Sequence, residues 1–272
     1  MYGWGSHILR WMELGHKRVG SGPPLLLIHG LGGSQDTFDT IIDVLAARHE
    51  VIAIDLPGSG ASAPLPGAHT IPAYADAVTE WLTGQGLRGI DVVGSSLGAR
   101  LALELARRGG VVGRVVALDP GGFWGSGAQR FFAVSVGVSI KLVNTLRPLL
   151  PFLTGNPVTR TILLPQFTTK PWAIPQAVAL PALRGFKDPG TKSAYAFLSK
   201  GPQQEGVPAG ALENPVLMVW GKQDHVTPHT QSTLAQQRFP DAEIRKLERC
   251  GHFPHWDQPK QTAELILTHT AS

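Results

Sequence analysis

Short apolar runs recur along the chain, and each closes on glycine, proline or a polar residue. Strands that are apolar on both faces and alternate with helical segments are typical of a parallel sheet covered on both sides. Five runs have this character: 25–30 (LLLIHG), 51–58 (VIAIDLPG), 90–96 (IDVVGSS), 115–122 (VVALDPGG) and 215–221 (PVLMVWG). The pattern predicts an α/β protein with a mostly parallel sheet.

Between these runs, apolar residues recur at the 3.6-residue period of helices. Ser34 is a candidate cap for a helix whose apolar positions are Phe38, Ile41, Ile42 and Leu45. The remaining predicted elements are helices over 71–82, 97–108 and about 258–268, and a last strand over 242–247.

One long stretch breaks this alternation. More than 90 residues separate Asp119 from Pro215, and their helical pattern is interrupted by prolines: Pro148, Pro157, Pro171, Pro181 and Pro189. A connection of this length inside a compact domain is usually functional. We therefore expect a core domain of residues 1–121 and 212–272, with residues 122–211 inserted as a helical cap.

Composition narrows the class of protein. The chain has 272 residues, 16% of them charged, and a formal net charge of +4 without a long run of like charges, which argues against a nucleic-acid partner. A single cysteine excludes an internal disulfide, and the opening MYGWGSHILRW lacks a secretory signal pattern, so we expect a cytoplasmic protein. Polar residues and prolines interrupt the apolar stretch 131–153, so no membrane span is expected. Monomer and homodimer both remain open.

The motif G-x-S-x-G occurs at residues 94–98, with Ser96 in its centre. The motif alone is a weak signal, but here it lies between a predicted strand and a predicted helix, where a sharp turn can expose a nucleophile. Such a turn crowds the positions two before and two after the serine, which favours glycine at both. Only Ser96 has both glycines at this spacing, so Ser96 rather than Ser95 is the candidate nucleophile.

A serine nucleophile needs a base, and the base needs an orienting group. Asp224 follows the predicted strand 215–221, and His252 follows the last predicted strand, which gives the chain order Ser, Asp, His. Asp119 follows the preceding strand and is a rival for the acid, although we favour Asp224 and interpret Asp119 as a turn residue before Pro120.

When a serine attacks a carbonyl carbon, the carbonyl oxygen becomes an oxyanion, which two backbone N–H donors are expected to stabilise. The N–H groups of Leu97, directly after the nucleophile, and Leu31, in the glycine-rich loop after the first long strand, are the candidates. That loop does not match a dinucleotide fingerprint, because its third glycine would fall on Gln35. The His, Cys and acidic residues do not cluster at the spacings typical of metal ligands, and the sequence contains no phosphate-binding Walker loop. We therefore expect no metal and no cofactor.

Together these motifs resemble the α/β-hydrolase superfamily over nearly the whole chain. The matching segments are 29–30, 55–62 (DLPGSGAS), the elbow 94–98, 221–224 with Pro228, and 251–257 (GHFPHWD). Ser59 stands where the family commonly has His. The resemblance implies a mostly parallel eight-stranded sheet flanked by helices, with the cap inserted between the sixth strand and Asp224.

Other residues receive supporting roles. His29 is expected to brace the oxyanion loop, Asp55 to support a turn, Cys250 to be a small buried side chain, and His225 and His255 to lie at the rim. The candidate pocket residues are His29, Gly30, Ser95, Trp124 and Phe253. The predicted cap contains a group of aromatic and aliphatic residues, most of which are expected in the core and a minority in the pocket. The group consists of Phe123, Trp124, Phe131, Phe132, Phe152, Leu153, Phe167, Trp172 and Phe186.

These residues predict a serine hydrolase that cleaves a small-molecule carboxylic ester with an apolar acyl or alcohol part. Carbon–carbon bond hydrolases of aromatic ring-cleavage products, lactonases, thioesterases and perhydrolases use the same triad and remain alternatives. Carbon–carbon hydrolysis requires a group that binds the substrate carboxylate, for which Arg160 and Arg184 are the candidates. A receptor-like module that binds a ligand without turnover is the alternative from a different class.

Overall fold

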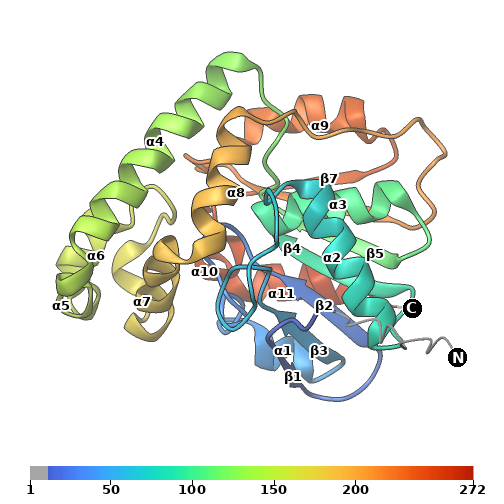
Figure 1. Cartoon of the computed structure of the whole chain (residues 1–272), viewed down its shortest axis with the longest axis horizontal. Helices are drawn as coiled ribbons and strands as arrows, with labels where there is room; N and C mark the ends of the chain where they lie inside the picture. Colours follow the sequence, from blue (N-terminus) through green and yellow to red (C-terminus); the bar gives the residue numbers. More distant parts are fainter. Residues whose placement is uncertain (1–11, 272) are drawn as a thin grey trace, which may run out of the picture.

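A computed structural model of the chain describes residues 12–271, in which seven strands form one sheet in the order β1-β3-β2-β4-β5-β6-β7 (Figure 1). All neighbouring pairs are parallel except β1 and β3. The strands are β1 His16–Val19, β2 Pro24–Ile28, β3 Glu50–Ile54, β4 Ile90–Ser95, β5 Val112–Leu118, β6 Val216–Gly221 and β7 Glu243–Leu247. The mostly parallel sheet is confirmed, with seven strands in the described residues rather than the expected eight. The opening MYGWGSHILRW lies outside the described residues.

The central strands are buried on both faces, as their uninterrupted apolar runs predict. In β2, Leu26 and Ile28 belong to the apolar cluster on one side of the sheet, and Leu25 and Leu27 belong to the cluster on the other. Parallel pairing places the carboxyl ends of β4, β5 and β6 at one edge. Loops that leave that edge hold all the predicted catalytic residues.

The helices of the core are α1 Ile42–Ala46, α2 Ile71–Gly84, α3 Leu97–Arg108, η4 His229–Gln231, α9 Ser232–Arg238, α10 Pro254–Asp257 and α11 Pro259–His269. Three of them, α2, α3 and α11, lie at the predicted positions; the first helix is shorter than expected, and η4, α9 and α10 were not predicted. Ser34 does not cap a helix. Its hydroxyl accepts a bond from the N–H of Asp36 and its own N–H donates to Thr37 Oγ1, so consecutive turns replace the expected helix up to residue 41.

Between β5 and β6 the chain forms a series of helices that lie to one side of the sheet, with α8 nearest to it (Figure 1). They are α4 Ser126–Thr145, η1 Arg147–Leu149, α5 Leu150–Gly155, α6 Pro157–Leu163, η2 Pro171–Ala173, α7 Gln176–Arg184, η3 Gly185–Lys187 and α8 Pro189–Lys200. We call residues 126–200 the inserted helices. Prolines begin several of them, where a missing N–H costs no helical bond, whereas Pro181 lies inside α7.

Within residues 12–271, no single helix is both long and apolar enough to cross a membrane. The segment Ser126–Thr145 and the segment Arg147–Gly155 together reach that length and composition, but they are bent by 68° at the break between them.

Candidate active site

Ser96 lies at a sharp turn between β4 and α3, with φ of 54° and ψ of −111°. A non-glycine residue rarely adopts positive φ, so the surrounding packing has to hold this conformation. A side chain at Gly94 would approach the carbonyl oxygen of Gly98 to 2.2 Å, and one at Gly98 would approach that of Ile28 equally closely. The two glycines of the motif are therefore sterically required. The N–H of Ser96 donates to the carbonyl of Leu118 at 2.8 Å, which ties the turn to β5.

The structure brings Ser96, His252 and Asp224 into one chain of hydrogen bonds. Ser96 Oγ lies 2.9 Å from His252 Nε2, and His252 Nδ1 lies 2.9 Å from Asp224 Oδ2. His252 is only 2% exposed. Its N–H donates to the carbonyl of Phe167 at 2.9 Å, so a loop of the inserted helices holds the histidine's backbone. This arrangement keeps the imidazole between its two partners.

Asp224 is held in its ionised form by its neighbours. Burial opposes ionisation, but the charge of His252 and the hydrogen bonds from His252, Asp119 and Thr227 outweigh it and lower the pKa of Asp224 to about 2. Its Oδ1 accepts the N–H groups of Val226 (2.7 Å) and Thr227 (3.0 Å), and its Oδ2 accepts the Thr227 hydroxyl (2.7 Å). The carboxylate therefore faces the imidazole as a fixed anion. Thr227 was not predicted from the sequence.

Asp119, the rival acid, lies at the end of β5 in a different state. Its Oδ1 accepts the N–H of Gly221 at 2.9 Å, whereas no donor reaches its buried Oδ2, so the Asp119 side chain bonds to Asp224 only when it is protonated. Burial and the negative charge of Asp224 raise the pKa of Asp119 well above its ordinary value. A protonated carboxyl cannot stabilise an imidazolium as an anion does, so the geometry favours Asp224 as the acid.

Asp119 makes the stability of the protein pH-dependent. The folded chain keeps a proton on Asp119 that the unfolded chain loses above about pH 3.9, so this group lowers the free energy of unfolding by about 1.4 kcal/mol per pH unit up to its folded pKa. Asn is neutral throughout. As the pH rises from 5 to 7, we expect the free energy of unfolding of the Asp119→Asn variant, measured by urea unfolding, to rise relative to that of the parent chain. Asp43→Asn, at an exposed carboxylate on α1, is the control; equal changes in both variants would contradict the assignment.

The loop after β2 supplies candidate oxyanion donors. Among residues 12–271, the N–H groups of Leu31 and Leu97 donate to no protein acceptor. A side chain at Gly30 would lie 3.0 Å from Ser96 Cβ, which shows how closely this loop approaches the nucleophile. His29 braces the loop as predicted: its Nδ1–H donates to the Gly30 carbonyl at 2.7 Å and its Nε2 accepts the N–H of Leu56 at 2.9 Å. Burial lowers the pKa of His29, so it stays neutral.

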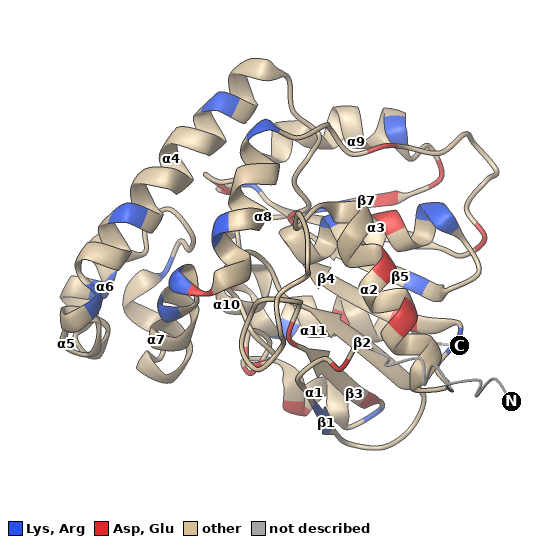
Figure 2. Cartoon of the chain, in the orientation of Figure 1, with Lys and Arg blue, Asp and Glu red and all other residues tan. Residues whose placement is uncertain are grey.

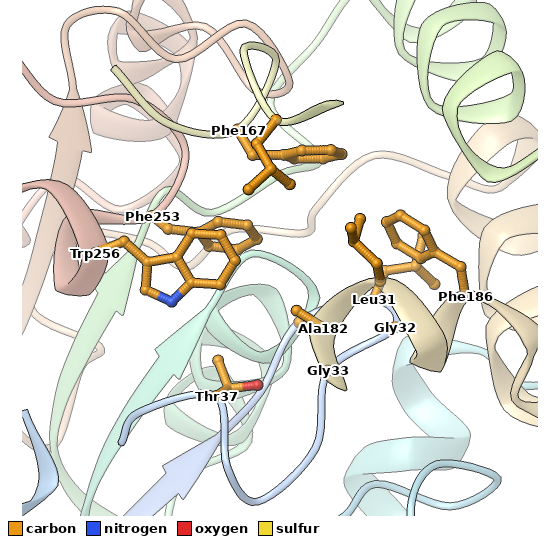
Figure 3. Close-up of a pocket in the computed structure, with 12 residues that line it drawn as sticks. Leu31, Gly32, Gly33, Thr37, Phe167, Ala182, Phe186, Phe253 and Trp256 are labelled. Atoms are coloured by element: carbon orange, nitrogen blue, oxygen red, sulfur yellow. The ribbon is translucent and has the colours of Figure 1, made fainter. Parts of the chain in front are cut away.

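Two apolar chambers adjoin the site. The reactive chamber, about 390 Å³ including its open mouth, is lined by Leu31, Ser96, Phe132, Val136, Phe167, Phe186, Leu198, Val226, His252 and Phe253. The outer chamber, about 410 Å³ by the same measure, is lined by Gly30, Leu31, Gly32, Gly33, Thr37, Leu164, Phe167, Ala182, Leu183, Phe186, Phe253 and Trp256 (Figure 3). Neither lining contains Lys, Arg, Asp or Glu.

Four apolar residues belong to both linings: Leu31, Phe167, Phe186 and Phe253. Figure 3 shows them around the outer chamber, with Phe167 opposite Thr37, and Phe253 and Trp256 across from Leu31 and Phe186. Phe167 stacks against Phe253 with ring centroids 6.0 Å apart. The four side chains therefore form the boundary between the two chambers.

The predicted pocket is only partly correct. Gly30 and Phe253 line chambers, but His29, Ser95 and Trp124 do not. His29 is turned into the protein by its two hydrogen bonds, and Ser95 is fully buried as the last residue of β4. Trp124 is buried behind Phe132, against which it stacks at 4.9 Å.

Several supporting roles also change. His255 is fully buried rather than at the rim, and burial lowers its pKa to about 3, whereas His225 is exposed. Cys250 is buried as predicted, and burial raises the pKa of its thiol. Asp55 accepts the N–H groups of Gln35 and Ala61, as expected of a turn support.

The expectation that most cap aromatics lie in the core is wrong for three residues. Phe131, Phe152 and Trp172 are exposed. Hydrophobicity does not show which side of a helix faces the protein when the helix is apolar all round. Phe132, Phe167 and Phe186 are the pocket members of this group.

Sequence reasoning gave no role to Asp257, which joins the histidine loop to the inserted helices. Its side chain accepts the N–H groups of Gly251 (2.6 Å) and Thr169 (2.9 Å) and the hydroxyl of Thr168. Asp257 is the last residue of the segment 251–257, five positions after His252. This fixed sequence spacing is the signal from which its role could have been predicted.

The two arginines considered for a substrate carboxylate lie elsewhere. Arg160 is buried in the inserted helices, where it donates to the carbonyls of Thr154 (2.6 Å) and Trp172 (2.9 Å). Arg184 is exposed and lines a polar groove with Asp55 and Asp188 on the far side of Gly32. Neither residue lines a chamber.

Comparison with known proteins identifies the class. Residues 25–265 match the model of the alpha/beta hydrolase family, and the chain belongs to this family. It is 28% identical to an uncharacterized protein of Mycobacterium bovis (93% of this chain, 77% of that one) and 27% identical to a 2-hydroxymuconate semialdehyde hydrolase of Pseudomonas putida (91% and 86%). The structure of a thermophilic esterase from Thermogutta terrifontis shares the fold, with a TM-score of 0.72, 21% identity and 95% of both chains covered.

Proposed function

We propose that the protein is a serine hydrolase that cleaves carboxylic esters with apolar groups on both sides of the scissile bond. The observation that carries this proposal is the chain of two 2.9 Å contacts from Ser96 through His252 to Asp224 at the wall of an apolar chamber. Nucleophile, base and acid follow three parallel strands of one sheet, in the chain order expected for such a site.

In this mechanism, Ser96 Oγ attacks the ester carbonyl carbon while His252 Nε2 takes the hydroxyl proton. The Nδ1–H of His252 donates to Asp224, whose negative charge stabilises the imidazolium. The N–H groups of Leu31 and Leu97 hold the oxyanion. His252 then protonates the leaving alcohol, and a water molecule, deprotonated by the same nitrogen, releases the acid from the acyl-enzyme. Asp119 does not enter the reaction. We further propose that residues 1–121 and 212–272 form the core domain that carries the site and that residues 122–211 form the cap.

The charges near the site favour an ester over a carboxylate-bearing substrate. Burying an unpaired carboxylate in an apolar chamber is costly. Arg160 is committed to backbone carbonyls, and Arg184 lies in a separate groove. A carbon–carbon hydrolase of ring-cleavage products would need a cation, and neither chamber is lined by Lys or Arg. Asp119, Asp224 and His252 place ligand-type atoms within 4.8 Å of one another, but Asp224 and His252 already bond to each other, so we assign these two to catalysis rather than to a metal site.

An ester panel tests the substrate class. We expect p-nitrophenyl esters of apolar acids to be hydrolysed, and esters with a carboxylate at the end of the same acyl chain to have a kcat/KM lower by about tenfold or more. Phe186→Ala opens the boundary between the chambers and is expected to raise the laurate to butyrate ratio of kcat/KM about tenfold. Val44→Ala, on the exposed side of α1, is the control. Preference for the charged esters, or turnover of a ring-cleavage product alone, would contradict the proposal.

A further inference from the structure

The exposed apolar side chains are concentrated in one part of the molecule. Of ten large hydrophobic residues with high exposure among residues 12–271, nine lie in the inserted helices and only Val44 lies elsewhere. The nine are Phe131, Val134, Val138, Leu142, Leu149, Phe152, Val158, Ile162 and Trp172. Single exposed hydrophobics are ordinary on protein surfaces, but such a concentration marks an interaction surface.

The longest inserted helix, α4, is apolar on two sides. Phe131, Val134, Val138 and Leu142 are all exposed, and at about 100° per residue they fall within an arc of about 80°. The buried residues of α4 face another way, and two of them, Phe132 and Val136, line the reactive chamber. The outward stripe therefore has no partner within the described chain. The exposed apolar residues of η1, α5 and α6 follow directly after it along the chain, and Figure 1 shows α5 and α6 at one end of α4.

This part of the chain is also strongly cationic. Residues 126–200 contain nine basic residues and one acidic residue, Asp188, whereas the rest of the chain carries a net negative charge (Figure 2). The nine are Arg130, Lys141, Arg147, Arg160, Lys170, Arg184, Lys187, Lys192 and Lys200. None of them forms an ion pair within residues 12–271. Arg130 and Lys141 are exposed on one flank of the apolar stripe of α4.

We propose that the outward face of α4, η1, α5 and α6, called the docking face below, binds the surface of a lipid bilayer that carries anionic headgroups. A helix with an apolar face bordered by Lys and Arg is suited to lie in the interface, with its apolar side chains among the acyl chains and its cations at the headgroups. A second copy of this chain is a poorer occupant, because two faces of the same positive charge repel each other. The position of α4 places the reactive chamber one helix away from the bilayer.

Vesicle binding tests the docking face without depending on catalysis. The full chain carrying Ser96→Ala is sedimented with vesicles of phosphatidylcholine alone or of phosphatidylcholine and phosphatidylglycerol in equal parts, so that no lipid is consumed. We expect the anionic vesicles to be bound at least about tenfold more tightly, and this difference to shrink with added salt.

Two double variants separate the apolar and the ionic contributions. Val138→Ser with Ile162→Ser, and Arg130→Gln with Lys141→Gln, are each expected to weaken binding to the anionic vesicles about tenfold. Val44→Ser and Lys246→Gln, exposed positions outside the inserted helices, are the matched controls and should bind as the parent chain does. Near-UV circular dichroism verifies that each variant is folded.

Three results would overturn the proposal. The first is no binding to either vesicle, and the second is equal loss of binding in the variants and their controls. The third is a dimer in sedimentation velocity that either double variant dissociates, because the face would then be an interface between copies. Since Ser96→Ala is used throughout, failure of this test leaves the proposed hydrolase activity untouched, and failure of the activity test leaves the docking face standing.

Discussion

Ser96→Ala is expected to lower kcat for p-nitrophenyl butyrate by at least about 10⁴-fold, with KM changed little. Ser96 Oγ is the group at the wall of the reactive chamber that lies within hydrogen-bond distance of His252 Nε2, at 2.9 Å. Without it no acyl-enzyme forms, and only the oxyanion donors and substrate binding remain. Initial rates over a range of ester concentrations measure both constants.

The adjacent serine is a matched control. Ser95 is fully buried in β4, one residue before the nucleophile, and Ser95→Ala should keep activity within about threefold of the parent chain. A fluorophosphonate should label the parent chain and Ser95→Ala on Ser96, as peptide mass spectrometry can detect, and should leave Ser96→Ala unlabelled. Activity retained by Ser96→Ala, or stoichiometric ligand binding by a parent chain without turnover, would contradict the hydrolase assignment and favour a receptor.

Asp224→Asn is expected to lower kcat by about 10⁴-fold. An amide in this place cannot stabilise an imidazolium, and its NH₂ group favours the wrong tautomer of His252. The carboxylate is ionised well below neutral pH, because its neighbours lower its pKa to about 2. Its contribution to stability is therefore complete above about pH 4 and is lost as the pH falls toward 2. Stopped assays between pH 6 and pH 9 measure the loss of kcat in a range where this stability contribution is complete.

Asp119→Asn is the control for this prediction. Asp119 follows the neighbouring strand and its side chain borders Asp224; its raised pKa favours the neutral form, so an amide of the same shape, which is also neutral and can donate, should leave kcat within about fivefold of the parent value. The reverse result, a large loss in Asp119→Asn and a small one in Asp224→Asn, would make Asp119 the orienting acid.

Local sequence rules were sufficient where the chemistry depends on short spacing. Gly94 and Gly98 are required within one turn of Ser96, so the elbow and helix α3 over Leu97–Arg108 could be predicted from neighbouring residues. The same rules failed at Ser34, where side-chain bonds to nearby N–H groups compete with a helix. Apolar periodicity does not report that competition.

The sequence by itself determined the class of this protein. Apolar runs bounded by glycine and proline specify a buried parallel sheet, and parallel pairing alone carries residues that follow different strands to one edge. Ser96, Asp224 and His252 were therefore predictable as one site, although Ser96 and Asp224 are 128 positions apart.

Only the tertiary structure decided the surroundings of that site. The inserted helices are apolar on more than one side, so Phe132 in the reactive chamber and Phe131 on the docking face look equivalent in the sequence. The difference between Asp119 and Asp224 is likewise tertiary, because burial and the contact of Asp224 with His252, 28 positions further along the chain, set their charges. A side chain's environment depends on what packs against it from distant segments, which local patterns do not encode.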